Sequence, residues 1–160
     1  MESEASRVHL SHDPRASHDD PLLDGLLALC MLHQKPASAA MLTTGLPLPK
    51  QRLSVELLPR AAARAGLQGR VLQRKLEEIP AIAMPALLLL KDGRSAVLLG
   101  WQGENEARVL LSEADGGEQW VSREELGEHY SGQALFARPR HELEDLRAPL
   151  VPRVNAWFRD

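Results

Sequence analysis

The spacing of apolar residues changes near residue 84, and this change constrains the fold more than any other feature of the chain. Three apolar segments follow, separated by Asp92-Gly93 and by the turn-forming stretches GENEA (103–107) and ADGGEQ (114–119). An Asp-Gly pair between apolar runs is typical of a β-hairpin. We therefore predict strands at 84–90, 95–102, 107–112 and 118–121, and a last strand in QALFAR (133–138).

The residues before this point favour helices. Asp20 and Pro21 are suited to the N-cap and first turn of a largely buried helix. SAAMLTTG predicts a second short helix, and VELLPRAAARAG a third, which Ser54 can cap and which Pro59 can delay. LQGRVLQRKLEEIP (67–80) suggests a short strand and one helical turn, and Ser122 with Glu125 forms a capping box for a helix at 123–129. Helices followed by an antiparallel sheet predict the α+β class.

Composition narrows the classes of function. The 160 residues include 19 basic and 22 acidic side chains, a net charge of −3, so the basic excess expected of a nucleic-acid-binding protein is missing. The longest run without charged or polar residues, IPAIAMPALLLL (79–90), contains two prolines and is shorter than the roughly 20 residues that cross a membrane. A single cysteine excludes an internal disulfide and favours a reducing, cytosolic setting.

The chain divides into three parts by pattern. Residues 1–19 lack apolar periodicity and suggest a mobile leader, residues 20–138 form the predicted domain, and residues 139–160 suggest a linker that ends in Trp157 and Phe158. The length is that of a single domain with a substantial core.

Cys30 and His33 are the first candidates for catalysis, because they share one face of the predicted first helix. Cys30 lies far from the helix N-terminus and between apolar neighbours, so packing is the favoured interpretation and a catalytic thiol the alternative. No metal-binding spacing of His and Cys is present, and no metal is expected. Three basic residues are most simply a solvated helix face, with binding of an anionic partner as the alternative: Arg60, Arg64 and Arg70.

Taken in order, the segments resemble the N-terminal peptidase-type domain of ABC exporters in its degenerate form. The matching segments are LLDGLLALCMLH (22–33), GLPLPKQRLSVELLPRAAARAGLQGRVLQR (45–74), IPAIAMPALLLLKDGRSAVLLGW (79–101) and RVLLSEADGGEQWVSREELGEHYSG (108–132). They cover about residues 20–138, and PALLLLKDGR is the most specific of them. The resemblance implies a papain-like cysteine-peptidase fold, and it is nearest to LapB-type exporters of biofilm adhesins.

The resemblance also assigns the catalytic positions of the family. The nucleophile position, immediately before the helix glycine Gly25, holds Asp24; the histidine position, after the KDGR turn, holds Ser95. The acid position holds Ser112, and the upstream glutamine position falls near His18. A carboxylate is not a thiolate, and serine is no general base at neutral pH, so peptidase activity by the family mechanism is not expected.

Substrate contacts are expected along the hairpin 84–102. The candidates are Leu89, which occupies the position of an aromatic residue in the family, together with Arg94, Ser95 and Trp101. A peptide groove without its nucleophile can still bind an extended chain.

Three hypotheses follow. The first is a non-catalytic domain at the cytoplasmic face of the bacterial inner membrane, which binds or positions an unfolded RTX-type adhesin for a type I secretion ABC transporter. The second is a regulatory or structural domain that contacts the ATPase of the exporter or another partner. The third is a cysteine peptidase that uses Cys30 and His33.

The resemblance implies no cofactor in this domain, with ATP and Mg²⁺ bound elsewhere in the full-length transporter. Besides the secreted protein, it implies contacts with the transmembrane and ATPase domains and, in the assembled system, a periplasmic adaptor and an outer-membrane channel. No nucleic-acid partner is expected.

Overall fold

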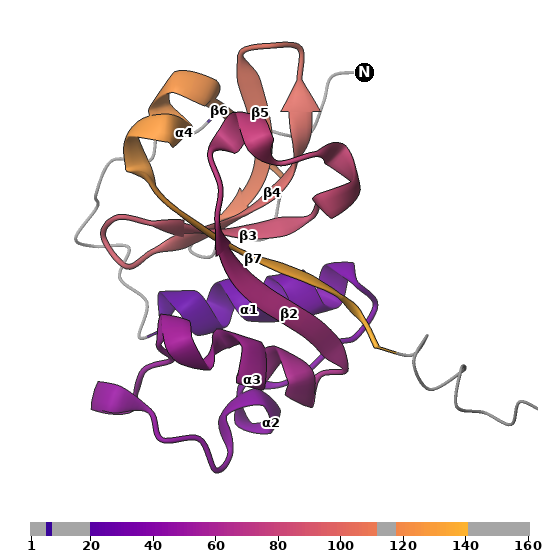
Figure 1. Ribbon diagram of the computed structural model, residues 1–160, viewed down its shortest axis with the longest axis vertical. Coiled ribbons are helices and arrows are strands. Elements are labelled where there is room, and N and C mark those ends of the chain that lie inside the picture. The colour runs from indigo at the N-terminus through magenta and orange to yellow at the C-terminus, as the bar shows by residue number, and fades with distance from the viewer. Residues whose placement is uncertain (1–5, 8–19, 112–117, 141–160) are drawn as a thin grey trace, which may run out of the picture.

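The computed structural model describes residues 6–7, 20–111 and 118–140 and has the α+β architecture predicted (Figure 1). The helices are α1 (Pro21–Leu32), α2 (Ala39–Thr43), α3 (Leu58–Arg64) and α4 (Arg123–His129). The strands are β1 (Ser6–Arg7), β2 (Leu67–Gln73), β3 (Ala86–Leu90), β4 (Ser95–Gln102), β5 (Glu106–Leu111), β6 (Gln119–Ser122) and β7 (Tyr130–Pro139). Helices α1 to α3 lie together on one side of the sheet, and α4 lies at its other end.

Helix α1 begins where the sequence predicts. One carboxylate oxygen of Asp20 accepts a hydrogen bond from the Leu23 amide at 3.3 Å, and Pro21 occupies the first turn. The second carboxylate oxygen accepts from the Leu53 amide at 2.8 Å. A single cap residue therefore satisfies an amide at the helix start and also fixes the loop that leads to α3.

The next two helices also follow the predicted pattern, with one difference. The Ser38 hydroxyl caps α2 by accepting from the Met41 amide at 3.1 Å. Before α3 the chain makes a single 3-10 turn, and the α-helix begins only at Leu58, next to Pro59. The Ser54 side chain makes no capping hydrogen bond, so the cap predicted there was wrong.

The strands form one sheet in the order β1-β6-β5-β4-β3-β7-β2. All neighbours are antiparallel except β1, which pairs parallel with β6. Gly93 (φ 87°) forms the predicted turn between β3 and β4, and this hairpin pairs Leu89 with Ser95. Strand β2 closes one end of the sheet, so no other strand among the described residues pairs with its outer edge.

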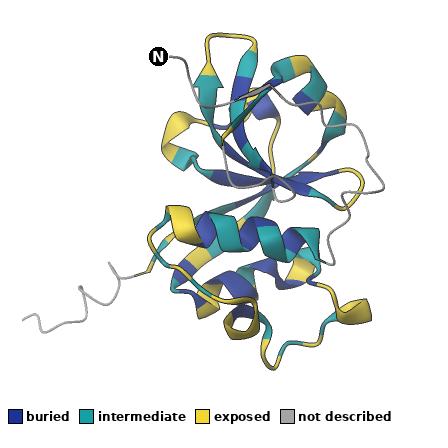
Figure 2. Cartoon of the chain, turned by 180° about the vertical axis from the view of Figure 1, so that it is seen from behind, coloured by how far each residue is buried: buried dark blue, intermediate teal, exposed yellow. Residues whose placement is uncertain are grey.

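The two faces of the sheet carry separate cores, because side chains along a strand alternate between faces. One core joins the leucines of α1 and α3 to Leu87, Leu89, Val97 and Leu135. The other joins Leu88, Leu98 and Val109 to Leu126 of α4 and to Leu76. Figure 2 shows the buried residues along both faces of the sheet and along the inner sides of the helices.

A register shift between Leu98 and Gly100 leaves Leu99 as an extra residue in β4. Such a bulge reverses the alternation of faces. Val97 belongs to the α1 core, and in a regular strand Trp101, four residues later, would lie on the same face. Because of the bulge, Trp101 lies on the other face and packs with Leu98 against the α4 core.

The expected leader (1–19) and linker (139–160) fall mostly outside the described residues. In the described part of the leader, Ser6–Arg7 forms β1, which the sequence did not predict. In the described part of the linker, Pro139 is the last residue of β7. The Arg140 amide then donates to the Gly66 carbonyl at 2.8 Å. In the described part of the chain, no helix combines the length and apolar character needed to cross a membrane.

Candidate functional site

The first turn of α1 packs against the start of β4, and this α1–β4 junction brings together two of the positions that the resemblance assigns. Asp24 lies half-buried in that first turn, where the helix dipole favours a carboxylate. Ser95 is fully buried, and its hydroxyl donates to the Pro21 carbonyl at 3.1 Å. The proton of the serine hydroxyl is therefore directed at the backbone of the helix.

Gly25 makes this close approach possible. A Cβ atom at position 25 would lie 2.2 Å from Ser95 Oγ and 2.8 Å from a methyl group of Leu87. Side-chain atoms do not approach one another this closely, so helix and strand can pack here only with a glycine.

The other predicted substrate residues are not gathered at one place. Leu89 is 3% exposed and belongs to the α1 core. Arg94 pairs with Asp92 at 2.8 Å within the hairpin turn. Trp101 lies at the far end of β4, roughly 20 Å from Ser95 at 3.3 Å per residue, with the Arg123 guanidinium 4.3 Å from the centre of its ring. Ser112 and His18 lie outside the described residues.

Cys30 and His33 are placed in a way that favours packing over catalysis. The Cys30 side chain is fully buried in the α1 core, and this burial raises the pKa of its thiol to about 11. The thiol is consequently protonated at neutral pH and is a poor nucleophile. Burial also lowers the pKa of His33, whose Nε2 atom is buried and has no hydrogen-bond partner among the residues that the structure describes.

A groove of about 810 Å³ lies over β2 and β7, away from the α1–β4 junction. Its floor contains Leu72 of β2 and Phe136 of β7, which are half-buried. The segment after β2 forms one wall with Pro80, Ile82, Ala83 and Met84, and Ile82 is 87% exposed. We call this feature the β2–β7 groove.

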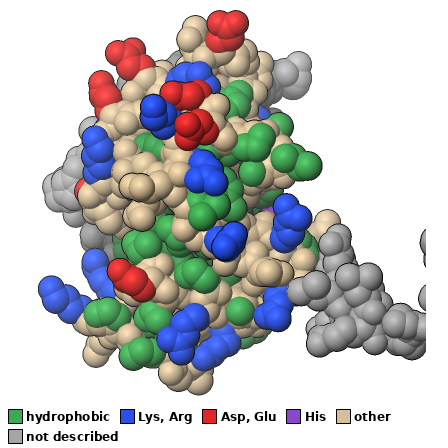
Figure 3. Space-filling model, in the orientation of Figure 1, with side chains coloured by type: hydrophobic (Ala, Val, Ile, Leu, Met, Phe, Trp, Pro, Cys, Tyr) green, Lys and Arg blue, Asp and Glu red, His purple; other side chains and the backbone are tan. Residues whose placement is uncertain are grey.

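Three arginines line the same groove, and all three are exposed: Arg70 on β2, Arg74 directly after β2, and Arg138 on β7. Figure 3 shows basic side chains over β2 and β7, with hydrophobic side chains between them. The predicted helical face of Arg60, Arg64 and Arg70 was wrong in this respect, because Arg70 belongs to a strand. Arg64 instead donates to the Thr44 carbonyl at 2.6 Å.

Sequence reasoning missed most of this groove. The alternation Arg70-Leu72-Arg74 is a signal that these side chains share one face of β2 and of the residue that follows it. Their combination with Phe136 and Arg138 follows only from the pairing of β2 with β7, in which Arg70 lies opposite Phe136 and Gln68 opposite Arg138. No group of three or more potential metal ligands occurs in the part of the chain that the structure describes.

Comparisons with known proteins agree with this architecture. The profile of the Peptidase C39 family matches residues 16–142. The N-terminal peptidase C39-like domain of the toxin secretion ATP-binding protein from Vibrio parahaemolyticus is 35% identical, with a TM-score of 0.73 over 77% of this chain and 99% of that one. The comparison with curated proteins gives no match.

Two peptidase structures share the fold at lower identity. The peptidase domain of Streptococcus ComA, a bifunctional ABC transporter of a quorum-sensing pathway, is 18% identical, with a TM-score of 0.64 over 83% of this chain and 98% of that one. A double-glycine-motif protease from an AMS/PCAT transporter, in complex with the leader peptide, is 15% identical, with a TM-score of 0.61 over 85% of this chain and 92% of that one.

Proposed function

The chain belongs to the peptidase C39 family, and from this membership we propose that it is a non-catalytic, substrate-binding domain of a type I secretion ABC exporter. The proposal places the domain at the cytoplasmic face of the bacterial inner membrane, where it holds an unfolded secreted protein before export. The exported protein is proposed to be an RTX-type adhesin, as the resemblance to LapB-type exporters implies.

One observation supports the proposed loss of catalysis. The nucleophile position assigned by the resemblance holds Asp24, and the histidine position holds Ser95, whose buried hydroxyl donates to the Pro21 carbonyl. Family chemistry requires a thiolate and a general base, and neither side chain supplies one at neutral pH. The protonated, buried thiol of Cys30 is no substitute.

The Vibrio parahaemolyticus relative supports the assignment to an exporter. That domain is the N-terminal part of a toxin secretion ATP-binding protein, and nearly its whole length matches this chain at 35% identity. We extend the same arrangement to this chain: transmembrane and ATPase domains in the same transporter, ATP and Mg²⁺ bound by the ATPase, and a periplasmic adaptor with an outer-membrane channel as partners.

Binding of an unfolded chain is supported by the fold. The double-glycine-motif protease shares this fold and holds a leader peptide. Extended peptides bind by pairing with an exposed strand edge and by placing side chains in pockets, and neither requires a catalytic residue.

The proposal is tested by titrating the isotope-labelled 160-residue chain with an unfolded, calcium-free C-terminal fragment of an RTX adhesin. We expect shifts of the backbone amide resonances and an intact fragment after prolonged incubation. The Asp24→Ala variant should behave identically, because Asp24 is not a nucleophile here. A titration without amide shifts would refute substrate binding, and cleavage lost in Asp24→Ala would refute the non-catalytic assignment.

A further inference from the structure

We propose that the β2–β7 groove binds an extended acidic segment of about seven residues with an apolar side chain inside it. This inference rests on the proposed function and deepens it, because it names the binding site and the chemistry of the exported segment. The floor of the groove includes Phe136, which packs with the α4 core on the sheet face opposite the α1–β4 junction, and His33 at the end of α1 also lines the groove.

The first argument is charge. Arg70, Arg74 and Arg138 are exposed in the groove, and among the described residues no carboxylate forms an ion pair with any of them. The acid that lines the groove, Glu78, accepts a hydrogen bond from the Lys75 amide at 2.9 Å and so closes the short helical turn beside it. The groove is therefore basic on a chain whose net charge is −3, and it complements carboxylates.

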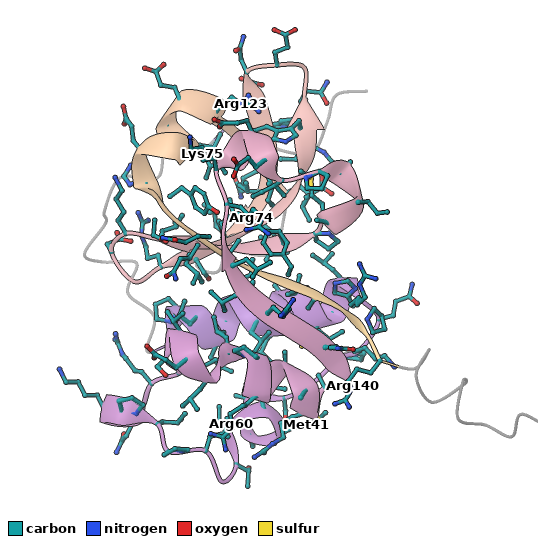
Figure 4. All side chains as sticks on the ribbon, in the orientation of Figure 1. Met41, Arg60, Arg74, Lys75, Arg123 and Arg140 are labelled. Carbon is teal, nitrogen blue, oxygen red and sulfur yellow. The ribbon has the colours of Figure 1, made fainter. Side chains whose placement is uncertain are left out.

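The second argument is spacing. Gln68 pairs with Arg138 and Arg70 pairs with Phe136, so Arg138 and Arg70 are diagonal neighbours about 7–8 Å apart. Arg74 follows Arg70 by four strand residues, or about 13 Å. Figure 4 shows Arg74 near the middle of the molecule, at the end of β2. An extended chain of about seven residues spans this row.

The third argument is the apolar floor. Leu72 and Phe136 lie between the outer arginines, and Ile82, with 87% of its side chain exposed, stands at the wall. A large exposed aliphatic residue beside a half-buried aromatic one is typical of a surface that buries a partner side chain. A peptide with one apolar residue among its acids matches both features, whereas a nucleic acid would match the arginines alone.

The fourth argument is the position of β2 at the end of the sheet. Its outer edge has no strand partner within the described parts of the chain. An extended segment at this edge gains main-chain hydrogen bonds in addition to ion pairs. Such bonds favour a polypeptide in extended conformation over a folded acidic protein.

The test uses a fluorescein-labelled peptide, Asp-Thr-Asp-Thr-Leu-Thr-Asp, and the same peptide in reverse order. Threonine favours the extended backbone, and the three acids match the arginine row. Binding to the 160-residue chain is measured by fluorescence anisotropy, and the site is mapped by amide shifts. We expect shifts concentrated in β2 and β7 for one or both orders, and an affinity that decreases with added salt.

Charge-reversal variants give the decisive comparison. Arg70→Glu and Arg138→Glu are each expected to weaken peptide binding about tenfold or more, because each replaces an attractive pair by a repulsive one. Arg60→Glu is the matched control: it makes the same charge change on an exposed residue of α3, away from the groove (Figure 4). It should alter the affinity less than about twofold, since exposed distant charges are screened.

Several outcomes would overturn the inference. Equal affinity for a peptide with Asn in place of Asp, or equal loss in Arg60→Glu, would show that the groove does not select acids. Oligothymidylate that binds more tightly than the peptide, with shifts in β2 and β7, would make the groove a nucleic-acid site. If the adhesin fragment binds but shifts other residues, the groove inference fails and the proposed function stands; if neither peptide nor fragment binds, the proposed function fails.

Discussion

The α1–β4 junction and the β2–β7 groove use opposite faces of one sheet and differ in almost every physical property. At the junction, Gly25 and the buried Ser95 are packed so tightly that a single added carbon atom would collide with a neighbour. In the groove, three exposed arginines surround an apolar floor in a space of about 810 Å³. Gly25 and Ser95 thus form a close packing contact, whereas the groove is an open surface.

The largest effect on stability is expected from Gly25→Ala. The new Cβ would lie 2.2 Å from Ser95 Oγ and 2.8 Å from the Leu87 side chain, and overpacking of this kind costs about 1–3 kcal/mol. Alanine normally stabilises a helix relative to glycine by about 1 kcal/mol. A decrease in the free energy of unfolding would therefore show that the added Cβ is overpacked at the junction. Chemical denaturation measures the free energy of unfolding.

Gly127 in α4 provides the matched control for Gly25→Ala. It is an exposed helical glycine whose added Cβ would meet nothing nearer than a Leu76 methyl group at 4.0 Å. Gly127→Ala should therefore raise the free energy of unfolding by about 0.5–1 kcal/mol. Stabilisation by both substitutions would mean that α1 is not packed tightly on β4.

The second prediction concerns the thiol of Cys30, which is buried in the α1 core. Because burial raises the folded pKa of Cys30 from 9.0 to about 11, the stabilising effect of the neutral thiol is complete below pH 9. It is lost as the pH rises to about 11, since the unfolded thiol ionises first. We expect the free energy of unfolding to decrease by about 2 kcal/mol over this pH range.

The measurement compares pH profiles of unfolding for the wild type and Cys30→Ala, because the substitution removes this titration and leaves the others, Tyr130 included. Above pH 9, the free energy of unfolding should decrease less steeply with pH in Cys30→Ala than in the wild type. Iodoacetamide should label the wild type at neutral pH only in denaturant. Rapid labelling of the folded chain would contradict the packing role and restore the peptidase hypothesis.

Much of the fold was predictable because local signals and tertiary structure agree. The Asp20-Pro21 helix start, the Asp92-Gly93 hairpin and the Ser122 cap each depend on residues within a few positions. The Ser54 cap failed because Pro59 delays the α-helix and the chain begins with a 3-10 turn. The bulge at Leu99, which sends Trp101 to the α4 core, has no local signal in an unbroken apolar strand.

The site was less predictable, since it depends on strands far apart in the sequence. Arg70 was assigned to a helical face together with Arg60, and only the pairing of β2 with β7 brings it beside Arg138. Leu89 and Ser95 were assigned from the family positions, and the structure places both in the interior, with Ser95 held against α1. Spacing in sequence could not reveal that the helix approaches β4 this closely.

The third prediction is Ser95→Ala, with an expected loss of about 1 kcal/mol. The substitution removes the hydrogen bond from the buried Ser95 hydroxyl to the Pro21 carbonyl. In a double-mutant cycle with Gly25→Ala, the two changes should not be additive, because the atoms that they alter are in contact. Additive free energies would separate Ser95 from the packing of Gly25.

The smallest effect is expected in the groove itself. Arg70→Glu should change the free energy of unfolding by less than about 0.5 kcal/mol, because Arg70 is exposed and has no ion-pair partner among the described residues. Arg60→Glu, the same charge change outside the groove, should give an equally small value. A loss above about 1 kcal/mol in Arg70→Glu alone would mean that the arginine supports the fold, and weakened peptide binding in this variant could then not be attributed to the groove. If Arg70→Glu weakens peptide binding and leaves the free energy of unfolding unchanged, the two regions have different roles. Substitutions at the α1–β4 junction would then alter stability, and substitutions in the β2–β7 groove would alter only peptide binding.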